Sequence, residues 1–255
     1  MGNAIGRAAL IDFSVQWVSF ILAAYLKTEK FYDAVGSLTY VILTAYSLIR
    51  GGQFFPRQVI QSGLVVTWAA RLGSFLLFRV LKAGQDSRFT KIRGNPKLFF
   101  FYWTVQGLWI FLMLLPTLIL NAKQEDTALC SRDYIGWAVW TAGMLIEAIA
   151  DYQKFSFRSN PANANKWIDH GLWSIVRHPN YLGEILLWFG HFIAATSAFS
   201  GLDYLSIISP LFITFLLTKV SGIPILERQN MKKWKGNPQY LQYVQTTPRL
   251  LPFLY

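Results

Sequence analysis

Long apolar stretches separated by short polar segments run through the whole chain. A membrane-spanning helix needs about 20 mostly apolar residues, and packed helices can be somewhat shorter. The stretches that approach this length are residues 8–26, 35–49, 59–81, 98–120, 134–150, 181–199 and 204–220. The pattern predicts an all-α, polytopic integral membrane protein with about seven transmembrane helices. We expect residues 1–255 to form a single membrane domain.

The composition and the distribution of charge agree with this prediction. The chain is 53% hydrophobic and only 15% charged, whereas soluble domains carry about 25% charged residues. Its net charge of +11 could indicate a nucleic-acid partner, but the basic residues lie between apolar runs. Loops on the cytoplasmic side of a membrane have this character. We therefore expect a membrane protein that binds no nucleic acid.

The positions of lysine and arginine also predict an orientation in the membrane. With the N-terminus outside, the loops after the first, third and fifth spans and the C-terminal tail hold most of the basic residues and are cytoplasmic. The membrane is that of the endoplasmic reticulum or a bacterial inner membrane. The opposite side keeps only Arg7, Arg50, Arg57, Lys123 and Arg132.

Several other kinds of site are excluded. Cys130 is the single cysteine, so no intrachain disulfide forms. The histidines, His170, His178 and His191, do not share a helical face and have no zinc-ligand spacing, so we predict no metal. The N-terminus has neither the charged region nor the cleavage site of a signal peptide.

One stretch, Gly171 to Glu184, gathers polar groups where an apolar segment begins. Pro179 suits the first turn of a helix, and the free N–H groups of a helix start favour anions. Arg177 and Tyr181 could be explained as anchors at the bilayer interface. Glu184 is not explained in that way, because a carboxylate inside an apolar run is expensive and usually functional.

Other polar and aromatic residues fall on the same predicted side of the membrane. They are Arg79, Lys82, Asp86, Arg88 and Phe89, then Asp151, Gln153, Lys154 and Arg158, then Lys166 and Trp167, and finally Glu227, Arg228, Tyr240 and Tyr243. Basic residues beside aromatic ones suit a ligand with phosphates and flat rings, such as a nucleotide. A second basic set, Lys91, Arg93, Lys232, Lys233 and Lys235, is more typical of contacts with lipid headgroups.

No glycine-rich GxGxxG follows a strand, and no Walker motif or serine-hydrolase elbow occurs. Any nucleotide must therefore bind in a pocket made by helices and loops.

The run Arg-His-Pro-Asn-Tyr-Leu-Gly-Glu at 177–184 resembles the signature of the steroid 5-alpha-reductase and sterol-reductase superfamily. The surroundings resemble its uncharacterised branch, a domain of unknown function. The further matching features are Trp68 with Arg71, Asp86-Ser87-Arg88-Phe89, Asp151-Tyr152-Gln153 with Arg158, Ser221 to Glu227, the pair Tyr240 and Tyr243, and the terminal Pro-Phe-Leu-Tyr. The resemblance covers about residues 63–255.

The resemblance implies a membrane reductase that uses NADPH. In the steroid reductases, the residues that match Asn180 and Glu184 contact the nicotinamide end of the cofactor, and those that match Asp151 and Arg158 bind its nucleotide part. We assign catalysis to Glu184 and Tyr181. The predicted cofactor-binding residues are Asn180, Glu184, Arg177, His178, Asp151, Arg158, Arg71, Arg79, Asp86, Arg88, Lys166, Trp167, Glu227, Arg228, Tyr240 and Tyr243.

The implied reaction is hydride transfer from NADPH to an activated C=C of a steroid-like or other enone lipid, at a cofactor site on the cytoplasmic side. The glutamate and tyrosine that polarise the 3-keto group in the steroid enzymes have no clear counterpart here. Gln53 and Gln106 are the polar candidates for substrate binding.

Two alternatives remain open. Isoprenylcysteine carboxyl methyltransferases carry a similar Arg-His-Pro-x-Tyr-x-Gly run and bind S-adenosylmethionine there. They tend to have an apolar or aromatic residue after the glycine, where this chain has Glu184. The other alternative is a lipid-binding membrane protein without activity, since a fold does not guarantee a function. Buried charges are costly to keep without use, which disfavours it.

Overall fold

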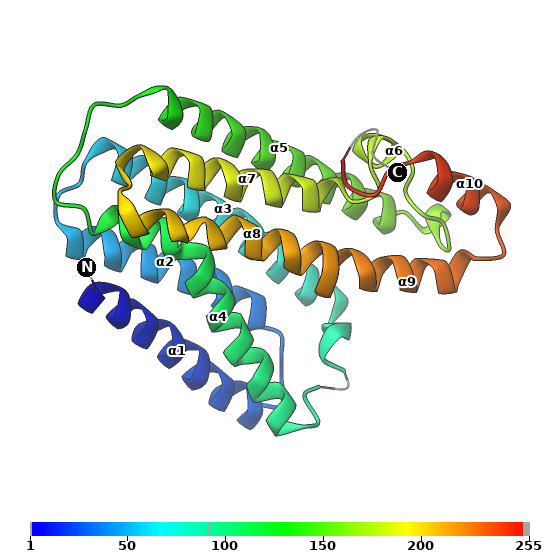
Figure 1. Ribbon diagram of the computed structural model, residues 1–255. Coiled ribbons are helices and arrows are strands. Elements are labelled where there is room, and N and C mark those ends of the chain that lie inside the picture. Colours follow the sequence, from blue (N-terminus) through cyan, green and yellow to red (C-terminus); the bar gives the residue numbers. More distant parts are fainter. Residues whose placement is uncertain (1, 91, 252–255) are drawn as a thin grey trace. The chain divides into compact units, whose positions relative to one another are not determined.

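The computed structural model of the chain describes residues 2–90 and 92–251, and these residues form helices without any strand (Figure 1). The α-helices are α1 (Gly2–Tyr25), α2 (Tyr32–Gly51), α3 (Pro56–Ala83), α4 (Pro96–Asn121), α5 (Ser131–Ser159), α6 (Leu172–Ile175), α7 (Pro179–Ala195), α8 (Ile208–Phe215), α9 (Gly222–Trp234) and α10 (Pro238–Thr246). Short helical turns connect them: η1 (Ser87–Phe89), η2 (Pro161–Asn163), η3 (Thr196–Ala198), η4 (Gly201–Ile207) and the π-helical η5 (Leu216–Val220).

Within the described residues, five helical segments are long and apolar enough to cross a membrane, judged by length and composition: Asn3–Tyr25, Tyr32–Gly51, Pro56–Ala83, Pro96–Asn121 and Gly201–Trp234. The prediction of an all-α, multi-pass membrane protein is therefore confirmed. The expected count of seven is not confirmed. Helix α7 has only 17 residues, and α5 carries charged residues from Arg132 to Arg158 along its length. Helix α5 corresponds to the fifth expected span, and α7 corresponds to the sixth.

The chain groups into two compact units. The first unit contains the chain up to Cys130 together with Ala195–Ser209. The second contains Ser131–Ala194 together with the chain from Pro210 onward.

Large aromatic side chains fill the interior of the first unit, where α2 packs on α3 and α4 and α1 packs on α4 and α2. Trp103 is fully buried, and Phe89, Phe99 and Ala23 pack in the same cluster. The ring of Tyr32 lies edge-on to Trp103 with 4.9 Å between ring centroids. Because lipid is as apolar as these side chains, it is close packing that holds such helices together inside a membrane.

Glycines bring α5 and α7 of the second unit into direct backbone contact. A Cβ atom placed on Gly183 would lie 2.5 Å from the backbone nitrogen of Glu147 and 2.6 Å from the carbonyl oxygen of Gly143. One placed on Gly190 would lie 2.5 Å from the carbonyl oxygen of Gly136. The glycine further along α7 contacts the earlier residue of α5, so the two helices are antiparallel and α7 begins beside the C-terminal half of α5. Small residues at helix crossings are typical of membrane proteins.

The π-helical turn η5 connects the apolar helix α8 to α9. The backbone N–H of Ser221 donates to the carbonyl of Leu216 at 2.8 Å, which closes a π-helical turn. A Cβ atom on Gly222 would lie 2.9 Å from the ring of Tyr181, so only glycine lets α9 begin against α7. Single π-helical turns of this kind are frequent beside functional sites.

Candidate functional site

The Gly171–Glu184 stretch folds as a short helix, an extended link and the start of α7. Gly171 adopts a positive φ of 63° and begins α6. A Cβ atom there would lie 2.4 Å from the side chain of Gln153, whose Oε1 accepts a 3.0 Å hydrogen bond from the N–H of Leu172. The indole N–H of Trp173 donates to the carbonyl of Ala150 at 3.1 Å. Helix α6 is thereby fixed to α5.

The C-terminal segment holds the extended link in place. The backbone N–H of Arg177 donates to the carbonyl of Pro248 at 2.8 Å, and that of His178 donates to Arg249 at 3.1 Å. The hydroxyl of Tyr243 donates to the carbonyl of Trp173 at 2.7 Å. The backbone before α7 is therefore fixed by α10 and the residues that follow it.

Glu227 of α9 binds both basic side chains of this link. Its Oε2 accepts from Arg177 Nη1 at 2.7 Å, and its Oε1 lies 2.8 Å from His178 Nε2. Arg177 is 7% exposed and His178 is 2% exposed, so the contacts are shielded from water. Burial lowers the pKa of His178, and Glu227 offsets only part of that effect. We therefore assign His178 as neutral near pH 7, with its proton on Nε2 facing the carboxylate.

The first turns of α7 carry the other residues that the sequence singled out. Asn180 Nδ2 donates to Asp151 Oδ1 of α5 at 3.3 Å. The ring of Tyr181 stacks on His178 with 5.7 Å between centroids and 10° between the planes. Glu184 follows Asn180 by one helical turn and is half-buried. These polar groups share the beginning of one helix, next to the end of α5.

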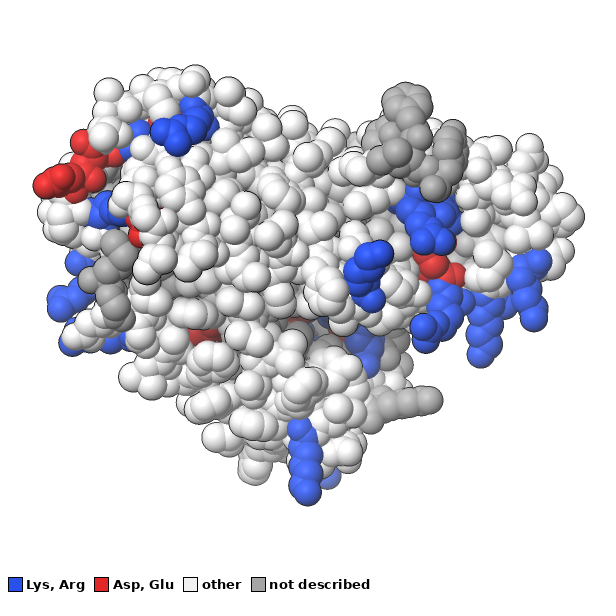
Figure 2. Space-filling view, in the orientation of Figure 1, with Lys and Arg blue, Asp and Glu red and all other residues white. Residues whose placement is uncertain are grey.

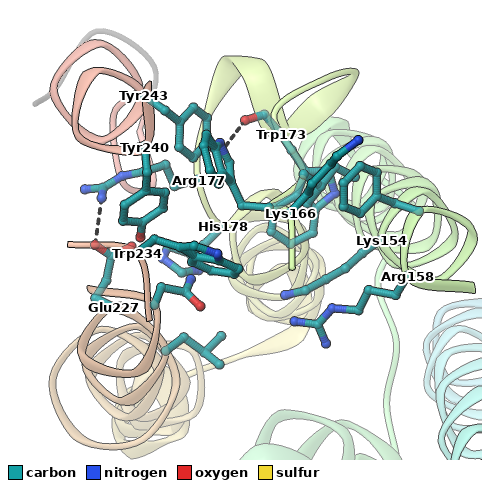
Figure 3. Close-up of a pocket in the computed structure, with 15 residues that line it drawn as sticks. Lys154, Arg158, Lys166, Trp173, Arg177, His178, Glu227, Trp234, Tyr240 and Tyr243 are labelled. Carbon is teal, nitrogen blue, oxygen red and sulfur yellow. Dashed lines mark hydrogen bonds and ion pairs between the residues drawn. The ribbon is translucent and has the colours of Figure 1, made fainter. Parts of the chain in front are cut away.

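A pocket opens beside this helix start, and its side chains come from α5, the loop before α6, α6, the link before α7, α9 and α10 (Figure 3). The described residues that line it are Lys154, Phe157, Arg158, Lys166, Trp167, Ile168, Trp173, Arg177, His178, Leu226, Glu227, Asn230, Trp234, Tyr240 and Tyr243. Four of them are lysine or arginine, and one is a carboxylate. The pocket thus has an excess of positive charge.

Aromatic rings narrow this pocket. Trp167 lies 5.1 Å from Tyr240 and 5.9 Å from Trp234, measured between ring centroids. The Lys154 ammonium lies 4.4 Å from the centre of the Trp173 ring. The resulting cavity measures only about 50 Å³. Ligand pockets usually measure about 300–1,000 Å³, so a large ligand requires these side chains to move apart.

Four buried polar atoms at this site have no hydrogen-bond partner within the described part of the chain. They are Arg177 Nε, His178 Nδ1, Asn180 Oδ1 and Trp167 Nε1. A buried polar atom without a partner costs about 1–3 kcal/mol. Both donors and acceptors are present, so a ligand with both kinds of group can satisfy them.

Figure 2 shows lysine and arginine side chains gathered along α9 and at its C-terminal end, whereas the surface of α8 is uncharged. Burial raises the pKa of Tyr243 above its usual range, and it also raises that of Tyr240. Both phenols are therefore protonated at neutral pH and can donate hydrogen bonds.

No group of three or more His, Cys, Asp or Glu is placed to hold a metal among residues 2–90 and 92–251.

The pocket brings together many of the predicted cofactor-binding residues. Those that line it are Arg158, Lys166, Trp167, Arg177, His178, Glu227, Tyr240 and Tyr243. Asp151, Asn180, Tyr181 and Glu184 lie at the adjoining turns of α5 and α7. Arg228 is exposed on α9. The terminal Pro-Phe-Leu-Tyr run is residues 252–255, which lie outside the described residues.

The other predicted site residues belong to the first unit. Arg88 binds Asp86 and also Asp33 Oδ2, the latter at 2.5 Å. Arg71 lies 6.0 Å from the centre of the Phe75 ring, and Arg79 is exposed. The two substrate candidates are also in this unit: Gln53 donates to Gln124 at 3.0 Å, and Gln106 donates to the carbonyl of Tyr32 at 3.1 Å.

The pair Asp86 and Arg88 belongs to a larger charged cluster at the loops after α1 and α3. Glu29 accepts from the backbone N–H of Asp86 at 3.0 Å and from Arg93 at 3.1 Å. Burial alone would raise the pKa of Asp86, but Arg88 holds it below its usual range. Arg93 thus has a buried carboxylate as its partner, whereas the sequence indicated lipid headgroups.

Sequence reasoning overlooked three aromatic residues of the pocket and undervalued one lysine. Phe157, Trp173 and Trp234 line it, and none of them was selected. Trp234 lies among lysines, a context that indicated a lipid-facing segment. Lys154 was noted but not assigned; it stands four residues before Arg158 on α5, and that spacing places both on one helical face.

These features define an all-α membrane protein with a positively charged, aromatic pocket at the start of α7. The chain belongs to the family described as protein of unknown function (DUF1295), which it matches over residues 19–247. A relative in Schizosaccharomyces pombe, "Uncharacterized protein C594.04c", is 24% identical over 165 residues, which cover 54% of this chain and 48% of the relative. The chain therefore spans about half the length of that relative. No solved structure matches it.

Proposed function

We propose that this protein is an NADPH-dependent membrane reductase that transfers hydride to an activated C=C of an enone lipid, such as a steroid-like compound. The observation that carries the proposal is the run at 177–184. It resembles the steroid- and sterol-reductase signature, and its Arg177 and His178 line a pocket with four cationic side chains and one carboxylate among the described residues.

The residues present suit a phosphorylated dinucleotide. Lys154, Arg158 and Lys166 supply positive charge for phosphate groups. Trp167 and Trp234 supply ring faces that a base can stack against. The four buried polar atoms without partners supply hydrogen-bonding capacity for a carboxamide or ribose. The 50 Å³ cavity is small for such a ligand, so binding requires the Trp167, Trp234 and Tyr240 rings to separate.

NADPH supplies a hydride when it is bound, and the remaining tasks fall to the chain's own residues. Asn180 is held by Asp151, which fixes its amide for contact with the nicotinamide end. Glu184 stands one turn further along α7 and extends the same polar edge. The carbon next to the substrate carbonyl needs a proton after hydride transfer. We assign its delivery to the Tyr181 hydroxyl, since Tyr181 stands between Asn180 and Glu184 and is oriented by stacking on His178.

The charge of the pocket also bears on the methyltransferase alternative. S-adenosylmethionine carries a positively charged sulfonium and no phosphate, whereas NADPH carries several negative charges. A pocket with four lysine or arginine side chains and one carboxylate favours the anionic ligand. A lipid-binding protein without activity would bind neither nucleotide specifically.

The test is calorimetry on the detergent-purified protein with NADPH, NADH and S-adenosylmethionine side by side. We expect NADPH to bind most tightly, with Trp fluorescence changing as the rings separate. In the variant Lys154→Gln/Arg158→Gln, NADPH should bind about tenfold or more weakly. The matched control Lys232→Gln/Lys235→Gln removes the same charge from exposed positions at the end of α9 that do not line the pocket and should leave binding unchanged.

Binding of S-adenosylmethionine alone would replace the reductase by a methyltransferase. Failure of all three compounds to bind would favour a non-catalytic lipid-binding protein. If NADPH binds, turnover of a panel of enone lipids identifies the substrate.

A further inference from the structure

A second and larger cavity lies in the first unit, where α1 begins and α2 and α4 end. It measures about 320 Å³, within the range of small-molecule sites. The described residues that line it are Asn3, Ala4, Ile5, Arg7, Tyr46, Ser47, Arg50, Gly51, Leu118, Ala122 and Gln124. The proposed reductase function uses none of them.

The lining of this cavity combines positive charge with apolar surface. Arg7 comes from α1 and Arg50 from the last turn of α2, and none of the described lining residues is acidic. Tyr46 adds a hydroxyl group, whereas the Ser47 hydroxyl already donates to the carbonyl of Thr44 at 2.9 Å. Two guanidinium groups with a neighbouring phenol match the oxygens of a phosphate group. The C-terminal end of α2 also borders the cavity and carries a partial negative charge, which is smaller than the positive charge of the two arginines.

Arg7 and Arg50 differ from the other basic residues of this end of the unit. Arg57 forms an ion pair with Asp126, and Lys123 forms one with Asp203 at 2.5 Å. Arg7 and Arg50 have no hydrogen-bond or ion-pair partner within the described part of the chain, yet they border the same cavity. Two cations left without acids and placed around one space indicate an anionic ligand.

The position of the cavity indicates where that anion comes from. Helices α1, α2 and α4 are three of the segments long and apolar enough to cross a membrane, and the cavity lies at their ends. The ends of membrane helices lie at the depth of lipid headgroups. Exposed apolar side chains stand close to both arginines on the same helices, Leu10 one turn after Arg7 and Ile49 next to Arg50, and an acyl chain can lie along them.

We propose that this cavity binds the phosphate group of an anionic phospholipid, with Arg7 and Arg50 holding the phosphate oxygens. The shared chemistry is that of a phosphate group, and a lipid source explains why the arginines stand beside apolar surface at a helix end. The proposal goes beyond the proposed reductase function and does not depend on it.

Native mass spectrometry of the full chain in detergent, titrated with phosphatidylglycerol, phosphatidylcholine or inorganic phosphate, tests the proposal. We expect the wild-type protein to bind phosphatidylglycerol more tightly than phosphatidylcholine, and inorganic phosphate weakly. Arg7→Gln/Arg50→Gln should weaken phosphatidylglycerol binding about tenfold or more. Lys27→Gln/Lys97→Gln removes the same charge from exposed positions after α1 and at the start of α4, and should leave binding unchanged.

Circular dichroism of the lipid-free variants checks that they are folded. Equal binding of the two lipids by the wild-type protein overturns the proposal without reference to any variant. Unchanged phosphatidylglycerol binding by a folded Arg7→Gln/Arg50→Gln protein also overturns it. Inorganic phosphate binding as tightly as phosphatidylglycerol would overturn the assignment to lipid.

Discussion

The two units of this protein pack their helices in different ways. In the first unit, bulky rings such as Trp103 fill the space between helices, which meet mainly through side chains, although the backbone of Gly51 contacts that of Asn121 where α2 and α4 end. In the second, Gly143 and Gly183 bring the backbones of α5 and α7 together. A side-chain contact can adjust by a rotation, whereas a backbone contact cannot. The site at the start of α7 therefore rests on the more rigid kind of packing, which suits residues that must be held at fixed positions.

The largest effect should follow from adding one methyl group to the backbone contact. Gly183→Ala places a Cβ atom 2.5 Å from a backbone nitrogen, so the helices must separate. We expect a loss of about 3 kcal/mol or more in the free energy of unfolding. In the first unit, Gly36→Ala meets only the amide end of the Gln106 side chain, which can rotate away, and should cost about 1 kcal/mol.

Thermal unfolding followed by circular dichroism in detergent measures both changes. Gly63→Ala is the control, since no atom lies within 4 Å of the added Cβ atom and alanine favours a helix. Similar losses for Gly183→Ala and Gly36→Ala would contradict the distinction between backbone and side-chain contacts.

The second effect comes from removing the carboxylate that joins α9 to the start of α7. Glu227→Gln leaves the buried Arg177 without its ion pair. Removing one partner of a buried pair costs about 3–5 kcal/mol, and partial exposure of Glu227 should reduce this to about 2 kcal/mol. In the first unit, Arg88→Gln should cost less, about 1 kcal/mol, because the Arg88 side chain is 51% exposed.

Denaturant unfolding of both variants gives these two values. Hydrogen exchange measured by mass spectrometry should show faster exchange at the start of α7 in Glu227→Gln. Faster exchange confined to α1–α4 would show that Glu227 does not hold this site.

A third comparison uses the same kind of hydrogen bond in each unit, from a tyrosine hydroxyl to a backbone carbonyl. The Tyr243 hydroxyl donates to the carbonyl of Trp173 at 2.7 Å, and the Tyr32 hydroxyl donates to that of Tyr102 at 2.8 Å. The first bond is half-buried and the second is exposed. Tyr243→Phe should therefore cost about 1 kcal/mol and Tyr32→Phe about 0.5 kcal/mol. Unfolding midpoints rank the two, and a larger loss for Tyr32→Phe would reverse the expected order.

The smallest effect should be a difference in pH dependence. The pKa of His178 is lower in the folded protein than in the unfolded chain, so the unfolded chain binds the proton more readily. The contribution of neutral His178 to the free energy of unfolding is complete above about pH 6.5 and falls as the pH drops below that value. The pKa of Asp86 is also lowered, but for a carboxyl group the loss begins only below about pH 4.

Between pH 6.5 and pH 4.5 or so, the second unit should therefore weaken before the first. Hydrogen exchange at a series of pH values, corrected for the intrinsic exchange rate, separates the units. His178→Gln should reduce the pH dependence at the first turn of α7 in that range, while the buried His191 in the same helix accounts for what remains. A wild-type α7 with no pH dependence there would contradict the lowered pKa of His178.

The apolar pattern alone was sufficient to predict helices that cross a membrane, because a spanning helix requires a long run of apolar residues whatever its neighbours are. The cost of a carboxylate in such a run singled out Glu184 as a candidate, and the mixture of basic and aromatic residues singled out Arg158 and Trp167, which line the pocket. These are local properties of the chain. The residues that match a family signature could likewise be found without a structure.

Only the tertiary structure showed which of these residues share a pocket. Arg88 and Arg158 are alike in the sequence, yet Arg88 pairs with Asp33 and Arg158 lines the site. Their partners are distant in the chain, and no local pattern encodes such pairing. The structure likewise showed that Pro248 and Arg249 hold the backbone before α7. It also brought Arg7 and Arg50 to one cavity, because the packing of α1 on α2 decides which helix ends meet.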